Sequence, residues 1–196
     1  MRRNVVRLAA LGLLGLLLGL AFSPPALQGE VGGRDAARVC RGKLERLAST
    51  LRQGESAQDS FREDEINAHL VALLNQNRRV QTAKGLTVGV QDLRLHMGEA
   101  PTFYVDTRLL SLPLVFSIGF ESCGEGRPRT RSVSVGRLPM VGPFRSLVQG
   151  RMKPLFSRLR NEKIVWDHFA ACEVEDKIIT VSVAGETGES TAAGRT

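Results

Sequence analysis

The chain has 196 residues and a formal net charge of +7, with 27 basic and 20 acidic residues. The charge falls to +4 without the three arginines among the first seven residues, which is a weak basis for nucleic-acid binding. A single Trp and a single Tyr also offer few rings on which bases could stack, so we expect no nucleic-acid partner. The roughly 170 residues that follow the N-terminal region suffice for one domain with a buried core.

The N-terminus carries the pattern of an export signal or a membrane anchor. Its three arginines precede an uncharged apolar run from Leu8 to Phe22, and retained arginines favour a cytoplasmic N-terminus. Small residues up to Ser23 suit a signal peptidase, whereas Pro24 disfavours the cut, so residues 1–23 are either a cleaved signal or a retained anchor. The expected anchor spans residues 5–22 and includes Val5, Leu8, Leu14, Leu18 and Phe22.

Both alternatives place the rest of the chain outside the cytoplasm. We expect a retained chain at the cell membrane, facing the periplasm or another extracytoplasmic space, and a cleaved chain to be secreted. Residues 24–33 contain Pro and Gly and are expected to be a linker, and residues 34–184 a single domain. Residues 185–196 lack large apolar side chains and are expected to be a disordered tail.

The chain contains three cysteines, an odd number in a compartment where disulfides persist. At most one internal bridge can therefore form. Cys123 and Cys172 both fall in or beside expected strands, which makes them the favoured pair over any pair with Cys40. The alternative is that all three are buried thiols.

Two helices are expected to precede a sheet. Apolar residues at steps of three and four from Ala37 to Leu51 predict the first helix, which ends near Gly54. The second is expected to begin at Ser60, because its hydroxyl and the Glu63 carboxylate, three positions later, can satisfy each other's exposed backbone N–H groups. The acidic residues at 63–65 then lie in the first turn, where the helix dipole favours negative charge without any catalytic role.

Beyond Gly85 the apolar period changes from 3.6 to 2, which predicts strands. Alternation over 86–97, 103–109, 114–120 and 133–135 indicates a meander of four antiparallel strands. A closing hairpin is expected from Ile164 to Val183, with its turn at Glu175 and Asp176. These segments add up to an antiparallel sheet of about six strands.

A long amphipathic helix is expected between the meander and the hairpin, from Pro143 to Lys163. Gly150 and Pro154 should weaken its middle. The opposite face is basic, so the helix either covers the concave face of the sheet or lies in a membrane interface beside anionic lipid. Its apolar stripe consists of Phe144, Leu147, Val148, Met152, Leu155, Phe156 and Leu159.

The sequence shows no motif that dictates a reaction. The three histidines form no zinc-binding pair, and no phosphate loop, nucleophile elbow or dinucleotide fingerprint occurs. His168 and Cys172 resemble a base and its thiol nucleophile, but residues four apart in a strand lie about 13 Å apart, too far for proton transfer. We therefore predict a protein that is not an enzyme and uses no cofactor or metal.

The order of these segments resembles a known type of envelope protein. The stretch from Phe61 to Leu70, the meander, Gly136 to Pro139, and the following helix and strands are similar to small membrane-anchored bacterial proteins of uncharacterised function. In those proteins a Glu-Leu-Asn motif opens a helix and a curved sheet wraps a long helix, and here residues 65–67 read Glu-Ile-Asn. The arrangement is similar to tubular (TULIP-like) lipid-binding domains and to the anchored YpmS-like family. The resemblance covers residues 60–183 and implies an apolar groove between sheet and helix.

We therefore predict an α+β fold in which an N-terminal membrane anchor and two helices precede an antiparallel sheet that wraps the long amphipathic helix. The expected function is to bind a lipid or another apolar ligand in the cell envelope. The alternative is an anchored scaffold or assembly protein that binds another envelope protein without a small ligand. The residues expected to line the groove are Phe116, Ile118, Phe120, Leu147, Val148, Met152, Leu155 and Phe156.

Overall fold

The computed structural model describes residues 2–23, 25–76, 82–83, 86–98, 100–109, 112–121, 124–126, 128–140 and 160–185. Within these ranges the helices are α1 (Arg2–Ala21), α2 (Arg34–Arg52), α3 (Glu63–Gln76) and α5 (Arg160–Asp167). The strands are β1 (Ala57–Arg62), β2 (Thr82–Ala83), β3 (Leu86–His96), β4 (Thr102–Leu109), β5 (Leu112–Phe120), β6 (Thr130–Val135), β7 (Leu138–Pro139), β8 (Phe169–Glu175) and β9 (Ile178–Val183). The predicted α+β class is confirmed.

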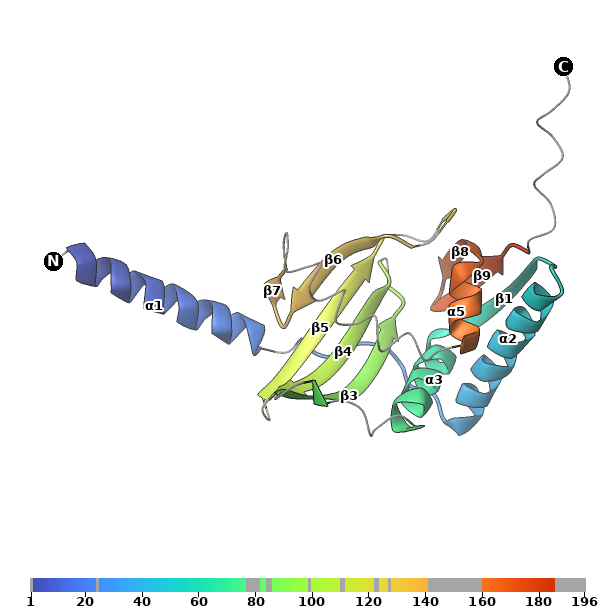
Figure 1. Ribbon diagram of the computed structural model, residues 1–196, viewed down its shortest axis with the longest axis horizontal. Helices are drawn as coiled ribbons and strands as arrows, with labels where there is room; N and C mark the ends of the chain where they lie inside the picture. The colour runs from blue at the N-terminus through green and yellow to red at the C-terminus, as the bar shows by residue number, and fades with distance from the viewer. Residues whose placement is uncertain are drawn as a thin grey trace, which may run out of the picture.

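The strands form two sheets rather than one (Figure 1). Strands β2 to β7 form an antiparallel meander in sequence order, as the alternation predicted, with two-residue strands at both edges. The closing hairpin β8–β9 instead pairs with β1 in a three-stranded sheet of order β1-β9-β8. The prediction of a single sheet of about six strands is therefore wrong, because the hairpin pairs with β1, a strand that was not predicted.

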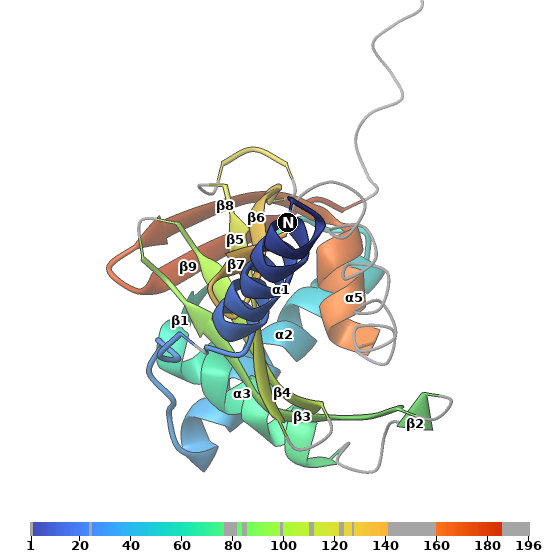
Figure 2. The same ribbon diagram turned by 90° about the vertical axis from the view of Figure 1, so that its left-hand side faces the viewer.

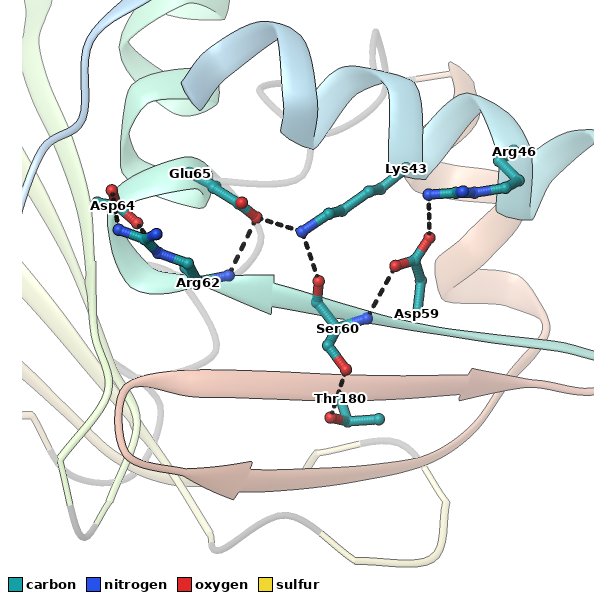
Figure 3. Close-up of polar contacts among 8 residues, drawn as sticks. All are labelled: Lys43, Arg46, Asp59, Ser60, Arg62, Asp64, Glu65 and Thr180. Carbon is teal, nitrogen blue, oxygen red and sulfur yellow. Dashed lines mark hydrogen bonds and ion pairs between the residues drawn. The ribbon is translucent and has the colours of Figure 1, made fainter. Parts of the chain in front are cut away.

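The start of the second helix was also predicted wrongly. Ser60 lies in β1, and its hydroxyl forms a hydrogen bond with the Thr180 hydroxyl of β9 at 2.9 Å (Figure 3). Helix α3 begins at Glu63, and the Glu65 carboxylate accepts a hydrogen bond from the Arg62 backbone N–H at 3.2 Å. This is half of a capping box, displaced by two residues from the predicted one.

The hairpin's first strand begins later than predicted. The apolar stretch from Ile164 contains the end of α5, and β8 starts at Phe169. A short apolar run does not by itself distinguish a strand from a helix. The predicted long helix over 143–163 lies outside the described residues except for its last four positions, which belong to α5.

One hydrophobic core joins the three-stranded sheet to helices α2 and α5. The predicted stripe of α2 faces this core, and Val165 of α5 closes it from the other side. Alternate residues of β1 and β9 supply the sheet's contribution, as expected for an amphipathic sheet with one buried face. The buried members are Cys40, Leu47, Leu51, Phe61, Val165, Val181 and Val183.

Side chains cover the outer edge of β1 (Figure 3). The Lys43 ammonium of α2 donates to the Ser60 carbonyl at 2.7 Å and pairs with the Glu65 carboxylate at 2.6 Å. The backbone N–H of Ser60 donates to the Asp59 carboxylate at 3.0 Å, and that carboxylate pairs with Arg46 at 2.9 Å. These bonds satisfy backbone groups that an unprotected edge strand would offer to another chain.

Helix α3 lies between α2 and the β3 side of the meander (Figure 1), and its buried face is polar. Glu63, Glu65, Asn67 and His69 are 2%, 8%, 0% and 8% exposed. Because residues four apart share a helix face, Glu63 and Asn67 point one way and Glu65 and His69 another. Glu63 and Asn67 bind the meander. Glu65 and His69 bind α2 and α5, the helices that pack on the three-stranded sheet.

The first pair holds the end of β3. Asn67 accepts a hydrogen bond from the Leu95 N–H at 2.6 Å and donates to the Leu95 carbonyl at 2.9 Å. Glu63 accepts one from the Met97 N–H at 2.6 Å. Both residues also bind Glu30, whose N–H donates to Glu63 at 2.8 Å and whose carbonyl accepts from Asn67 at 2.8 Å. The stretch expected to be a linker is thus held against α3.

Glycine is required where this stretch passes β3. Gly29 has φ +112°, and a Cβ atom built there would lie 2.7 Å from the Leu95 carbonyl oxygen. Three residues further on, the Gly32 N–H donates to the Asp64 carbonyl at 3.1 Å. Backbone and side chain therefore both contribute to fixing residues 29–32 in place.

The second pair reaches α2 and α5. Glu65 binds Lys43 as described above, and His69 Nε2 lies 2.8 Å from a Glu162 carboxylate oxygen. Burial alone raises the pKa of the Glu162 carboxyl. The hydrogen bond from His69, a hydrogen bond from the Glu162 backbone and the charges of His69 and Arg41 together outweigh burial and leave that pKa below its ordinary value. Helix α3 therefore connects both halves of the fold through polar bonds.

Helix α1 projects from the body (Figure 1), toward the viewer in Figure 2, and contacts the body at β7. The Arg137 N–H, in the turn between β6 and β7, donates to the Leu20 carbonyl at 2.9 Å. In the part of the chain that the structure describes, no helix combines the length and hydropathy needed to cross a membrane. The anchor expected over residues 5–22 gains no support from the structure and stays a prediction.

The described cysteines differ in state. Cys172 is disulfide-bonded, so the alternative of three buried thiols is wrong. Cys40 is a free thiol, 2% exposed, and burial raises its pKa to about 12. Cys123, the chain's remaining cysteine, lies outside the described residues, and its pairing with Cys172 stays a prediction.

We expect Asn67→Leu to lower the free energy of unfolding by about 3 kcal/mol, because it leaves three partly buried backbone groups without their partner. Urea unfolding followed by the fluorescence of the single Trp measures this loss. Asn75→Leu, near the end of the same helix and partly exposed, is the matched control and should change the value by less than about 0.5 kcal/mol. Similar losses in both variants would contradict the role given to Asn67.

Thiol labelling tests the cysteine assignments. In the native chain at pH 8, a maleimide reagent should leave Cys40 unmodified, because about one in ten thousand of such thiols is ionised at this pH. Denaturation without reductant should expose one reactive thiol per chain, and reduction should raise the number to three. A Cys40→Ala variant should show none before reduction. Three reactive thiols before reduction would exclude the predicted Cys123–Cys172 pair.

Candidate functional site

One face of the meander is mainly apolar, and the predicted groove residues of β5 lie on it. Pairing places Leu93, Val105, Phe116 and Val135 in one row across β3 to β6. Leu95, Phe103, Ile118 and Val133 form the next row. Val105, Ile118 and Val133 are buried, and the residues packed around them are only partly buried: Val90, Leu93, Phe103, Phe116, Phe120 and Met140.

The three predicted groove residues of β5 therefore lie on one face. Phe116 and Ile118 follow from strand alternation, and Phe120 joins them although the register shifts between Gly119 and Phe120. The five groove residues expected from the long helix, Leu147, Val148, Met152, Leu155 and Phe156, lie outside the described residues. That any of these residues binds a ligand stays a prediction.

The opposite face of the meander is polar. Asp92 pairs with Arg94 at 2.8 Å, and Asp106 lies directly across from Asp92 in the register. Burial raises the pKa of the Asp106 carboxyl above its ordinary value, and the Asp92 charge raises it further. Ser117 of β5 lies on this face, between two residues of the apolar one. This face also carries Val115, which lies across from Asp106 and is 3% exposed, so it is mainly polar but partly covered, whereas the other face is mainly apolar.

A second feature, which the sequence analysis missed, is a cavity of about 520 Å³ beside the three-stranded sheet. Its floor is the sheet face that points away from the α2–α5 core. Gln58, Ser182, Ala171 and Glu125 form one continuous row across that face, because Glu125 bridges to Ala171 outside the named strands. Thr180 and Glu173 pair in the next row.

The cavity's walls come from the loops at one end of the meander. Gly98 and Pro101 lie in the turn between β3 and β4, and Gly124 and Glu125 between β5 and β6. The second loop is fixed on β8, since Cys172 N–H donates to the Gly124 carbonyl at 3.1 Å. The alternation of hydroxyl and valine residues over 180–183 was the sequence signal for this polar floor.

The described residues offer little for catalysis. Cys172 is disulfide-bonded, so it cannot act as a thiol nucleophile for His168, and the His168 Nδ1 atom lies 3.0 Å from the Ile164 carbonyl. Cys40 is buried, and a thiol with a raised pKa is a weak nucleophile at neutral pH. Among the residues that the structure describes, no group of three or more His, Cys, Asp or Glu could hold a metal ion.

Comparison with known proteins leaves the chain without a match: no family model, no curated protein and no solved structure is similar to it. The resemblance to YpmS-like and TULIP-like proteins therefore stays a prediction.

We expect Asp106→Asn to stabilise the protein at pH 7 by about 0.5 kcal/mol, because it removes one of two like charges on paired strands. The raised pKa means that ionisation of Asp106 costs stability, so the gain should be full above the folded-state pKa and vanish below the unfolded value of about 3.9. Thermal unfolding at pH 7 and pH 3 measures this. In an Asp92→Asn background the gain should become smaller, because only the cost of burying the Asp106 carboxylate remains, and an unchanged gain there would refute the repulsion.

Proposed function

We propose that this protein is a non-enzymatic component of the cell envelope that binds a lipid or another apolar ligand on the apolar face of the meander. The observation that carries the proposal is the partial burial of Phe103, Phe116 and Phe120 around the buried residues of that face. Large apolar side chains that are only partly buried leave apolar surface that an apolar ligand could cover.

The length and apolar character of the face support an acyl chain as the ligand. Its rows cross four strands, which at the usual strand spacing gives a length of about 14 Å. Covering about 200 Å² of apolar surface contributes roughly 5 kcal/mol, enough to offset part of the cost of immobilising a flexible chain. Binding of this type needs no directional polar group, in agreement with the apolar character of the face.

The position of α1 supports a membrane as the source of the ligand. Its end binds the β6–β7 turn through Arg137, and Met140, just after β7, packs on the apolar face. The described leucines of α1 are largely exposed, for example Leu11 at 64% and Leu16 at 61%. An apolar helix and an apolar sheet face thus approach each other at one corner of the molecule, where a lipid could pass from one to the other.

The alternative is a scaffold or assembly protein that binds another envelope protein. One observation favours it: Trp166 of α5 is 45% exposed and stacks at a tilt against Phe169, with ring centroids 5.9 Å apart. Exposed tryptophans are enriched among the residues that dominate protein interfaces. This surface belongs to the other half of the fold, so the two functions can be tested separately.

Photo-crosslinking distinguishes the two. The full chain is incorporated into vesicles that contain a phospholipid with a diazirine in its acyl chain, and labelled peptides are mapped by mass spectrometry. We expect labels on β4 and β5, reduced about tenfold in Phe116→Arg, which places a charge on the apolar face. Ser117→Arg, the neighbouring residue on the polar face, is the matched control and should label normally.

Labelling of α1 provides the internal standard for contact with lipid. Circular dichroism of both variants checks that the sheet is intact. Labels confined to α1, or equal labelling in both variants, would exclude the lipid site. A bound partner protein that is lost in Trp166→Ala, together with lipid labels confined to α1, would favour the scaffold function.

A further inference from the structure

We infer that the cavity beside the three-stranded sheet is a binding site for an organic cation that carries N–H donors, such as an ammonium group. This inference does not rest on the proposed lipid function, because it uses different residues and a different kind of interaction. It rests on the cavity's construction, on the chemistry of its lining and on its position.

The cavity is built by ordered strands. Gln58, Ser182 and Ala171 lie on three adjacent hydrogen-bonded strands, and their register fixes the spacing of the side chains on the floor. The small side chains of Ala171 and Ser182 leave the volume open, while the loops that carry Pro101 and Gly124 form its walls. Ligand sites are commonly found where two structural units meet, and this cavity lies between the two sheets.

The lining selects for positive charge. Glu125 and Glu173 contribute two carboxylates, and the lining residues that the structure describes include no Lys, Arg or His. Within the described part of the chain, neither carboxylate takes part in an ion pair, although the whole chain carries a net charge of +7. Gln58, Thr180 and Ser182 add neutral oxygen acceptors. A cation with several N–H groups can satisfy both kinds of acceptor at once.

The position suggests two sources for the cation. Pro101 lines the cavity, and its carbonyl accepts a hydrogen bond from the N–H of Phe120, a member of the apolar face, at 2.9 Å. An ammonium could therefore belong to the headgroup of a lipid whose chain lies on the apolar face, or to a soluble amine. Both share the chemistry that the lining recognises.

Calorimetric titration of the full chain in a nonionic detergent, with spermidine and ethanolamine as probes, tests the site. We expect saturable binding that Glu173→Gln and Glu125→Gln each weaken about fivefold, as for loss of one exposed ion pair. Glu121→Gln, in the loop that carries Glu125 but outside the lining, is the matched control and should bind normally. Ser182→Leu, which fills the floor, should abolish binding, with circular dichroism and thermal unfolding checking the fold.

Tetramethylammonium separates site binding from nonspecific attraction, because it carries the charge without N–H donors and should bind much more weakly than ethanolamine. Vesicles with an ethanolamine or a glycerol headgroup then identify the source. A preference for the ethanolamine lipid that Glu173→Gln removes indicates the headgroup, and binding of the free amines alone indicates a soluble ligand. No binding of any amine, or equal weakening by Glu121→Gln, would overturn the inference.

Discussion

The two sheets of this protein keep their relative position largely through hydrogen bonds from one helix, to which the backbone bonds between the β5–β6 loop and β8 are added. Helix α3 places Glu63 and Asn67 against the end of β3, and Glu65 and His69 against α2 and α5. Apolar contacts alone tolerate sliding, whereas each of these bonds has a fixed direction and a costly unpaired state. The cavity between the sheets depends on this arrangement, since its floor belongs to one half of the fold and its walls to the other.

Local patterns in the sequence predicted the elements whose contacts are local. The 3.6 period gave α2 nearly to its ends, and the alternation from Leu86 gave the meander and the shared face of Phe116, Ile118 and Phe120. The errors concern distant partners. Ser60 has the sequence context of a helix cap, but its neighbours in β1 find strand partners in β9, 120 residues away along the chain. No local pattern contains that pairing.

The polar residues of α3 and the cavity were missed for related reasons. The acidic cluster at 63–65 has a sufficient local explanation in the helix dipole, so nothing in the sequence indicates that Glu63 binds backbone groups at Glu30 and Met97. The cavity floor gathers residues from β1, β9, β8 and the loop before β6, and each segment alone reads as an ordinary polar surface. By contrast, the apolar face of the meander comes from strands that follow one another in the sequence, so the alternation within each strand predicts it. This is why the meander was predictable.

The pairing of β1 with β9 also bears on how the chain reaches its native state. Strand β1 is synthesised early, yet its partner is among the last segments to emerge, and loop closure over such a distance is slow compared with the hairpins of the meander. The meander can therefore assemble first from neighbouring strands, while β1 stays unpaired and open to association with other chains. Lys43 belongs to α2, which is synthesised just before β1, and Asp59 belongs to β1 itself, so one edge of this unpaired strand can be protected before β9 is synthesised.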